Sequence, residues 1–115
     1  NNVRQIYLKD MSNLGAAPVL VSQFQSSAGN KDSFNPTISA DGARIAFETL
    51  STNLHPALAG NSTFQVMVAN RGSSTGPILA SDRADGTAAH GKSAQASISD
   101  NGRYVSFTSQ DLTLA

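Results

Sequence analysis

The chain has 115 residues, which suits a single domain with a modest core. Eight basic and eight acidic residues are scattered without runs, so no charged patch points to nucleic acid or an anionic membrane as a partner. The lack of cysteine excludes disulfides and thiolate sites, and no apolar stretch reaches the roughly 20 residues that a membrane-spanning helix needs.

Segments along the chain repeat each other at a spacing of 60 residues. The longest match pairs "ISADGARIAFETLSTNL" at 38–54 with "ISDNGRYVSFTSQDLTL" at 98–114. Two shorter matches keep this spacing to within one residue: "QIYL" at 5–8 with "QVMV" at 65–68, and "PVLVS" at 18–22 with "PILAS" at 77–81. A fixed period of this kind indicates a repeated structural unit.

Each matching segment is typical of a short β-strand. The segments are rich in Val, Ile, Phe or Tyr and are bounded by Gly, Asn, Asp, Ser or Pro. In chain order, we predict two strands in 3–22, four in 35–80 and two in 95–115. Nowhere do apolar residues follow the i, i+3, i+4, i+7 spacing of a helix. The sequence therefore predicts an all-β chain.

Two dipeptides, Asp41-Gly42 and Asn101-Gly102, lie between the first and second predicted strands of each unit. Tight hairpins need positive φ, which Gly, Asn and Asp tolerate at low cost. We interpret Asp41 as a turn residue and not as a catalytic or metal-binding carboxylate, because Asn101, its counterpart, could not act as a base.

The stretches "FNPTISADGARIAFETLSTNL" and "SAQASISDNGRYVSFTSQDLTL" each follow a strand-like segment such as "QIYLKD". This arrangement resembles the TolB-like (WD-related) β-propeller repeat over nearly all of the chain. The second unit departs from the pattern, with Ala96 in place of Pro36 and Asn101 in place of Asp41.

The resemblance implies one β-propeller segment over 1–115 with two four-stranded blade equivalents. Residues 3–22 would form a half blade, 35–80 a full blade and 95–115 a second half blade. Half blades leave open sheet edges, so either copies exchange strands to close a ring, or the chain is a fragment of a larger propeller. Since propellers have four to eight blades, a homo-oligomer of two to four copies would close, and a trimer with six blades is favoured.

Three long polar loops, at 23–34, 50–63 and 82–94, would share one face of such a ring. Function on rigid scaffolds concentrates in loops of this kind. We therefore predict a non-enzymatic module that recognises a protein partner through this face, with a glycan as the less favoured ligand. The candidate binding residues are the polar loop residues Lys31, Asp32, His55, His90 and Lys92.

No catalytic residue, metal site or cofactor is predicted. The chain lacks a G-x-S-x-G elbow and a Gly-rich loop that opens a helix. The loop "HPALAGNST" at 55–63 has no carboxylate for oxygen-ligated calcium. Phe34 and Phe64 lie at loop margins, where each could pack beneath a loop or contact a ligand, whereas the repeat-equivalent Phe47 and Phe107 are expected in the core.

An alternative function is that of a propeller fragment from a larger peptidase or hydrolase whose catalytic residues lie outside this chain. A purely structural repeat is a third possibility. The low charge, the high Ser, Ala and Asn content and the family resemblance favour an exported bacterial protein, periplasmic or extracellular.

Overall fold

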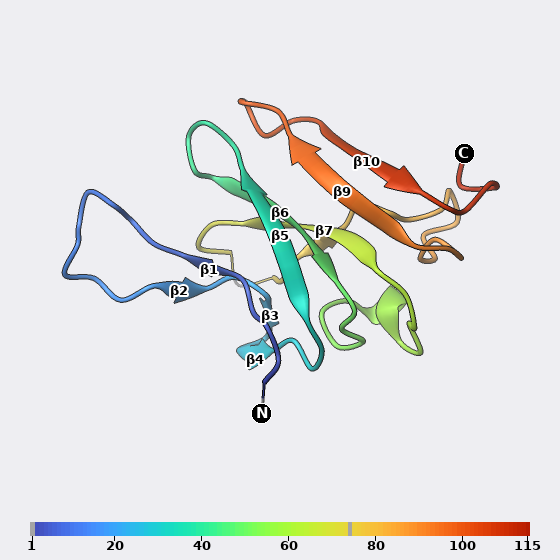
Figure 1. Ribbon diagram of the computed structural model, residues 1–115, viewed down its shortest axis with the longest axis horizontal. Helices are drawn as coiled ribbons and strands as arrows, with labels where there is room; N and C mark the ends of the chain where they lie inside the picture. The colour runs from blue at the N-terminus through green and yellow to red at the C-terminus, as the bar shows by residue number, and fades with distance from the viewer. Residues whose placement is uncertain (1, 74) are drawn as a thin grey trace.

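A computed structural model describes residues 2–73 and 75–115, so Asn1 and Ser74, which fall within the expected domain 1–115, lie outside the described residues. Over these ranges the chain forms ten strands and a single 3₁₀ helix, η1 (Pro56–Leu58) (Figure 1). The prediction of an all-β chain is confirmed. None of the helical structure in the described ranges has the length to cross a bilayer.

The largest sheet has four antiparallel strands that follow one another in chain order. These strands are β5 (Ser33–Ile38), β6 (Arg44–Thr49), β7 (Gln65–Asn70) and β8 (Ile78–Leu79). The central strand β6, "RIAFET", is buried at every position after Arg44. Burial on both faces accounts for the three consecutive apolar residues, Ile45 to Phe47, at its centre.

Side chains of β6 and β7 alternate between the two faces of this sheet, as the pleat of a strand requires. On one face Phe47 and Met67 pack in a core cluster that includes Ile6, which precedes β1 (Tyr7–Leu8). On the other face Ala46 and Val68 pack with residues of β9 (Ser93–Ile98) and β10 (Val105–Ser109), Ile98 among them. The four-stranded sheet therefore has a packing partner on each face.

These packing partners are two smaller antiparallel pairs, namely β1 (Tyr7–Leu8) with β2 (Val19–Leu20), and β9 (Ser93–Ile98) with β10 (Val105–Ser109). Figure 1 shows the pairs on opposite sides of β5 and β6, with the two chain ends far apart. The described residues form separate small sheets and no closed barrel.

The segment 23–34, expected as an irregular loop, contains a two-stranded hairpin. Its strands are β3 (Gln23–Phe24) and β4 (Ser27–Ala28). The turn between them places Gln25 and Ser26 at φ of 51° and 67°. Neither residue type is usual at positive φ, so the turn has no recognisable sequence signal.

Both predicted hairpin turns carry the same hydrogen bonds. In the first, Asp41 Oδ1 accepts from the Ser39 hydroxyl (2.8 Å) and from the Ala43 N–H (2.9 Å), and Gly42 has a φ of 71°. The Ala43 N–H, followed by the Ser39 hydroxyl, holds the pKa of Asp41 below its ordinary value. In the second turn the same bonds join Ser99, Asn101 and Arg103. Asp41 is therefore a turn residue, as the sequence indicates.

A second hydrogen-bond network occurs twice, once at the start of β7 and once just before β1 (Tyr7–Leu8). Gln65 Oε1 accepts from the Ser81 hydroxyl (2.6 Å), and Gln65 Nε2 donates to the Ala89 carbonyl (2.9 Å). Gln5 is the repeat equivalent of Gln65, and its side chain bonds the Ser22 hydroxyl and the Gly29 carbonyl in the same way. The repeat seen in the sequence thus extends to the hydrogen bonds of these polar side chains.

Candidate functional site

The three long loops lie at one end of the four-stranded sheet. The register places Ser33, Thr49 and Gln65 side by side at that end, where β5 begins, β6 ends and β7 begins. The N–H of Ser93, the first residue of β9, donates to the Phe64 carbonyl (2.9 Å). Loops 23–34, 50–63 and 82–94 therefore meet at this end, which we call the loop end.

Lys31 and Asp32 join the first of these loops to its neighbours. The Lys31 N–H donates to the Ser51 hydroxyl (3.2 Å), which in turn donates to the Lys31 carbonyl (2.8 Å). Asp32 is half-buried, and its Oδ1 accepts from the Arg4 N–H (2.8 Å). The Lys31 side chain is exposed and free to contact a partner, whereas the Asp32 carboxylate is engaged within the chain.

The two histidines differ in their surroundings. His55 caps η1, because its Nδ1 accepts from the Ala57 N–H (3.1 Å). His90 is exposed, with its Nδ1 2.7 Å from Arg83 Nη1. The backbone N–H of His90 donates to Asp111 Oδ2 (2.9 Å). This bond, ahead of two bonds from Thr113, lowers the pKa of Asp111 to about 2.

Lys92 is the one predicted residue that lines a groove at the loop end. Its Nζ lies 5.1 Å from the centroid of the Phe64 ring, and that ring makes an edge-to-face contact with Phe34 (centroids 5.0 Å apart). Within the described ranges, no side-chain hydrogen bond or ion pair joins any two of the five predicted residues. They share one end of the fold but do not form one cluster.

This loop-end groove has a volume of about 410 Å³ and lies between the four-stranded sheet and the β9–β10 pair. A space of this size falls in the range of pockets that bind small molecules or side chains. Its lining includes aromatic, charged and amide side chains: Phe34, Glu48, Phe64, Lys92, Gln95 and Gln110.

Glu48 lines the groove although it is only 3% exposed. Its Oε2 accepts from the Gln95 N–H (2.9 Å) and from Asn35 Nδ2 (3.2 Å). Asn35 and Gln95 occupy equivalent positions in β5 and β9, with φ of 55° and 57°. In the part of the chain that the structure describes, no cation lies within ion-pair distance of Glu48.

Sequence reasoning missed Glu48. The available signal was a charged residue inside "RIAFET", a strand segment that is otherwise largely apolar, since Glu is depleted in strands and seldom buried. What the sequence could not show is that β9 covers this position. The described residues contain no group of three or more His, Asp or Glu side chains placed to hold a metal ion.

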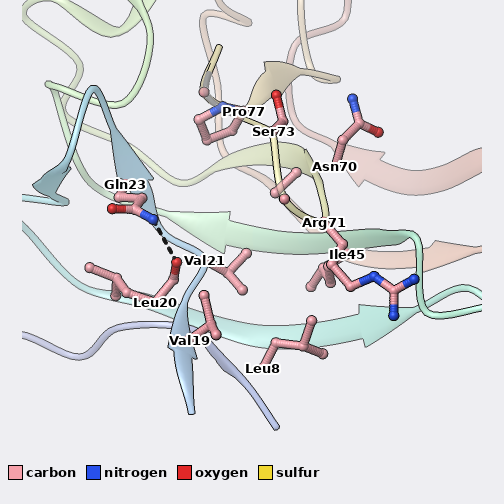
Figure 2. Close-up of a pocket in the computed structure, with 13 residues that line it drawn as sticks. Leu8, Val19, Leu20, Val21, Gln23, Ile45, Asn70, Arg71, Ser73 and Pro77 are labelled. Atoms are coloured by element: carbon pink, nitrogen blue, oxygen red, sulfur yellow. Dashed lines mark hydrogen bonds between the residues drawn. The ribbon is translucent and has the colours of Figure 1, made fainter. Parts of the chain in front are cut away.

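A second cavity of about 260 Å³ lies at the opposite end, beside the turn after β7 (Figure 2). Figure 2 shows Leu8, Val19, Val21 and Ile45 among the residues that line it, with Gln23 Nε2 bonded to the Leu20 carbonyl (2.9 Å). Ile45 belongs to the core cluster between the sheets, and Leu8 and Val21 pack against that cluster. Arg71 is the single charged residue among the described residues that line it. We interpret this cavity as space between packed sheets.

Comparison with known proteins does not assign the chain to a family. A scan against family models, a search of curated proteins and a search of solved structures all found no match. The functional interpretation therefore depends on the repeat, the sheet register and the geometry of the loop end.

Proposed function

We propose that the chain is a non-enzymatic β-propeller segment that recognises a protein partner at its loop end, with a glycan as the less favoured ligand. The observation that carries this proposal is the convergence of three loops from successive units around one groove with aromatic and charged walls. Loops on a rigid sheet scaffold are a common location of binding sites.

The packing of the sheets supports the propeller interpretation. The β1–β2 pair packs on the four-stranded sheet through Leu8, together with Ile6 just before β1, and the four-stranded sheet packs on β9–β10 through Val68 and Ala46. Because Leu8 and Val68 are repeat equivalents, successive units stack through the same face each time. Repeated face-to-face stacking of small antiparallel sheets is the packing that propeller blades use.

The open edge of β10 supports strand exchange between copies. β10 is the repeat equivalent of β6, which pairs with β7, and β1 is the equivalent of β7. Phe47 on β6 is fully buried beside β7, whereas its equivalent Phe107 on β10 remains partly exposed. A β1 strand from a second copy would complete this sheet and cover Phe107.

The register of β6 with β7 defines the pairing that we propose between copies. Ala46 lies opposite Val68, so the equivalent Ser106 would lie opposite Leu8 of the next copy. Three copies joined in this way would form six sheets. Their loop ends would surround one axis, and several weak contacts with a multivalent partner would gain avidity through effective concentration.

A cysteine pair tests this exchange, because the chain has no cysteine of its own. The Arg71 N–H donates to the Ala43 carbonyl, which makes Ala46 and Val68 a pair of the closer, non-hydrogen-bonded type, about 4.5 Å between Cα atoms. Leu8→Cys with Ser106→Cys should therefore give disulfide-linked oligomers on mild oxidation.

The matched control is Ala46→Cys with Val68→Cys, which should crosslink only within one chain. Light scattering of the unmodified chain gives an independent measurement, with a trimer as the expected mass. A monomer at micromolar concentration that forms no linked oligomer would contradict exchange between copies and would favour the fragment of a larger enzyme.

Binding is tested with the exposed loop-end residues. Replacing Lys31 and His90 together by Ala should abolish capture of the partner protein and leave the circular dichroism unchanged. Lys92 is kept because it lines the groove. Asp32 and His55 are kept because both hold local backbone bonds. The control is an Ala substitution of Arg71 at the opposite end. Partner capture that survives the double substitution, or fails equally in the control, would exclude the loop end as the binding face.

A further inference from the structure

We propose that the loop-end groove binds the basic side chain of a lysine or arginine, with Glu48 as its counter-ion. This inference rests on the proposed function, because the protein partner is the source of the basic side chain. It names the chemistry of one contact at the binding face.

The first argument is the state of the Glu48 carboxylate. A charged group that is 3% exposed is costly unless it is paired or fully hydrogen-bonded. Both bonds that Glu48 accepts go to Oε2, from the Gln95 N–H and the Asn35 amide. An ionised carboxylate can accept about four bonds, so Glu48 retains unused capacity on Oε1.

The second argument is where Oε1 lies. None of the buried side-chain nitrogen or oxygen atoms in the described residues lacks a hydrogen-bond partner. Oε1 accepts no hydrogen bond within the described ranges, so it is not fully buried, and the loop-end groove is the open space that Glu48 lines. A carboxylate with one oxygen fixed by the fold and the other open to a groove is oriented for an incoming donor.

The third argument is the aromatic wall. Phe34 and Phe64 line the groove with Glu48, and the ammonium of Lys92 already lies over the Phe64 ring. A cation is attracted to the face of an aromatic ring, and more strongly where water is excluded. The chain's own lysine thus shows that this wall accommodates an ammonium group.

The charges of the lining distinguish a cationic from an anionic ligand. Glu48 and Lys92 are the two charged residues of the lining, and they form no ion pair. Lys92 is exposed at the rim, whereas Glu48 lies deep. A basic side chain would bind Glu48 and be repelled by Lys92, while an acidic or sulfated ligand would need Lys92 and be repelled by Glu48.

The probes are N-acetyl-arginine amide and N-acetyl-lysine amide, titrated into the full chain and followed by NMR of the backbone amides. We expect saturable shifts that include the Gln95 amide, which donates to Glu48. N-acetyl-leucine amide, the neutral control, should give no such shifts. This comparison needs no variant, so it is informative even where a substitution disturbs folding.

Two variants then test the roles of the charges. Glu48→Gln keeps the shape and an acceptor oxygen for the Gln95 N–H, and it should weaken binding of the basic probes at least about tenfold, since hydrogen bonds to charged groups contribute about 1.5–3 kcal/mol. Lys92→Met should strengthen binding a few-fold. Equal binding of the neutral probe, unchanged affinity in Glu48→Gln, or loss of affinity in Lys92→Met would overturn the proposal.

The two proposals fail in different ways. If the double variant of Lys31 and His90 loses the protein partner while Glu48→Gln retains it at full affinity, recognition at the loop end stands and the cationic contact is wrong. If all variants retain the partner, the loop end is not the binding face.

Discussion

The buried Gln65 network allows a quantitative test within one chain. We consider Gln65→Leu, which keeps the side chain's approximate volume and removes both of its polar groups. Gln65 is fully buried, and the substitution leaves the Ser81 hydroxyl without its acceptor and the Ala89 carbonyl without its donor. Each buried polar group left unpaired costs about 1–3 kcal/mol, so the two together should lower the free energy of unfolding by about 2–6 kcal/mol.

Gln5→Leu is the matched comparison, because Gln5 makes the equivalent bonds to Ser22 and Gly29. Gln5 is half-buried although Ser22 and Gly29 are buried, so its two bonds lie nearer to water than those of Gln65, and we expect a smaller loss of about 1–2 kcal/mol. Urea unfolding followed by far-UV circular dichroism, at one protein concentration for all variants, gives both values. Equal losses, or a loss below about 1 kcal/mol for Gln65→Leu, would refute the assignment of the difference to burial.

Three further predictions concern packing, backbone conformation and pH. Phe47→Ala should lower the free energy of unfolding, measured with urea, by about 3–5 kcal/mol because Phe47 is fully buried. Phe107→Ala should lower it by less in dilute solution, and this loss should grow as the protein concentration rises. Gly102→Ala should cost about 1–3 kcal/mol because Gly102 has a φ of 72°. The Asp111 carboxyl should titrate by NMR near pH 2 and not near 3.8, so its contribution to stability, present above pH 3.8, should be lost as the pH falls through about 2.

The parts of the fold that could be predicted from sequence depend on local chemistry. The two turns with Gly42 and Gly102 use glycine where positive φ is needed, and the strand 44–49 follows from its apolar character between turn residues. The hairpin at 23–28 could not be predicted, because Gln25 and Ser26 adopt positive φ without a glycine or asparagine. Its conformation depends on tertiary packing, which places Phe24 against the core.

The candidate site was only partly predictable for the same reason. Lys92 could be predicted because the sequence shows directly that it is a polar residue in a long loop. The structure places it in the groove. Glu48 was not identified, because its importance arises when β9 packs across β6 and the Gln95 N–H bonds to it. That contact spans 47 residues of sequence, and nothing in the local sequence specifies it.

Repeat equivalence also predicts how often the loop-end groove occurs in an assembly of copies. Residue 108, the equivalent of Glu48, is Thr108. In a sheet completed by β10 and the β1 of a second copy, Thr108 would therefore occupy the position that Glu48 holds on β6. A hydroxyl cannot act as a counter-ion for a basic side chain. Three copies with six sheets would thus present three carboxylate grooves at alternate junctions, and saturation by N-acetyl-arginine amide should require one ligand per chain, whereas two per chain would show that Glu48 does not define the site.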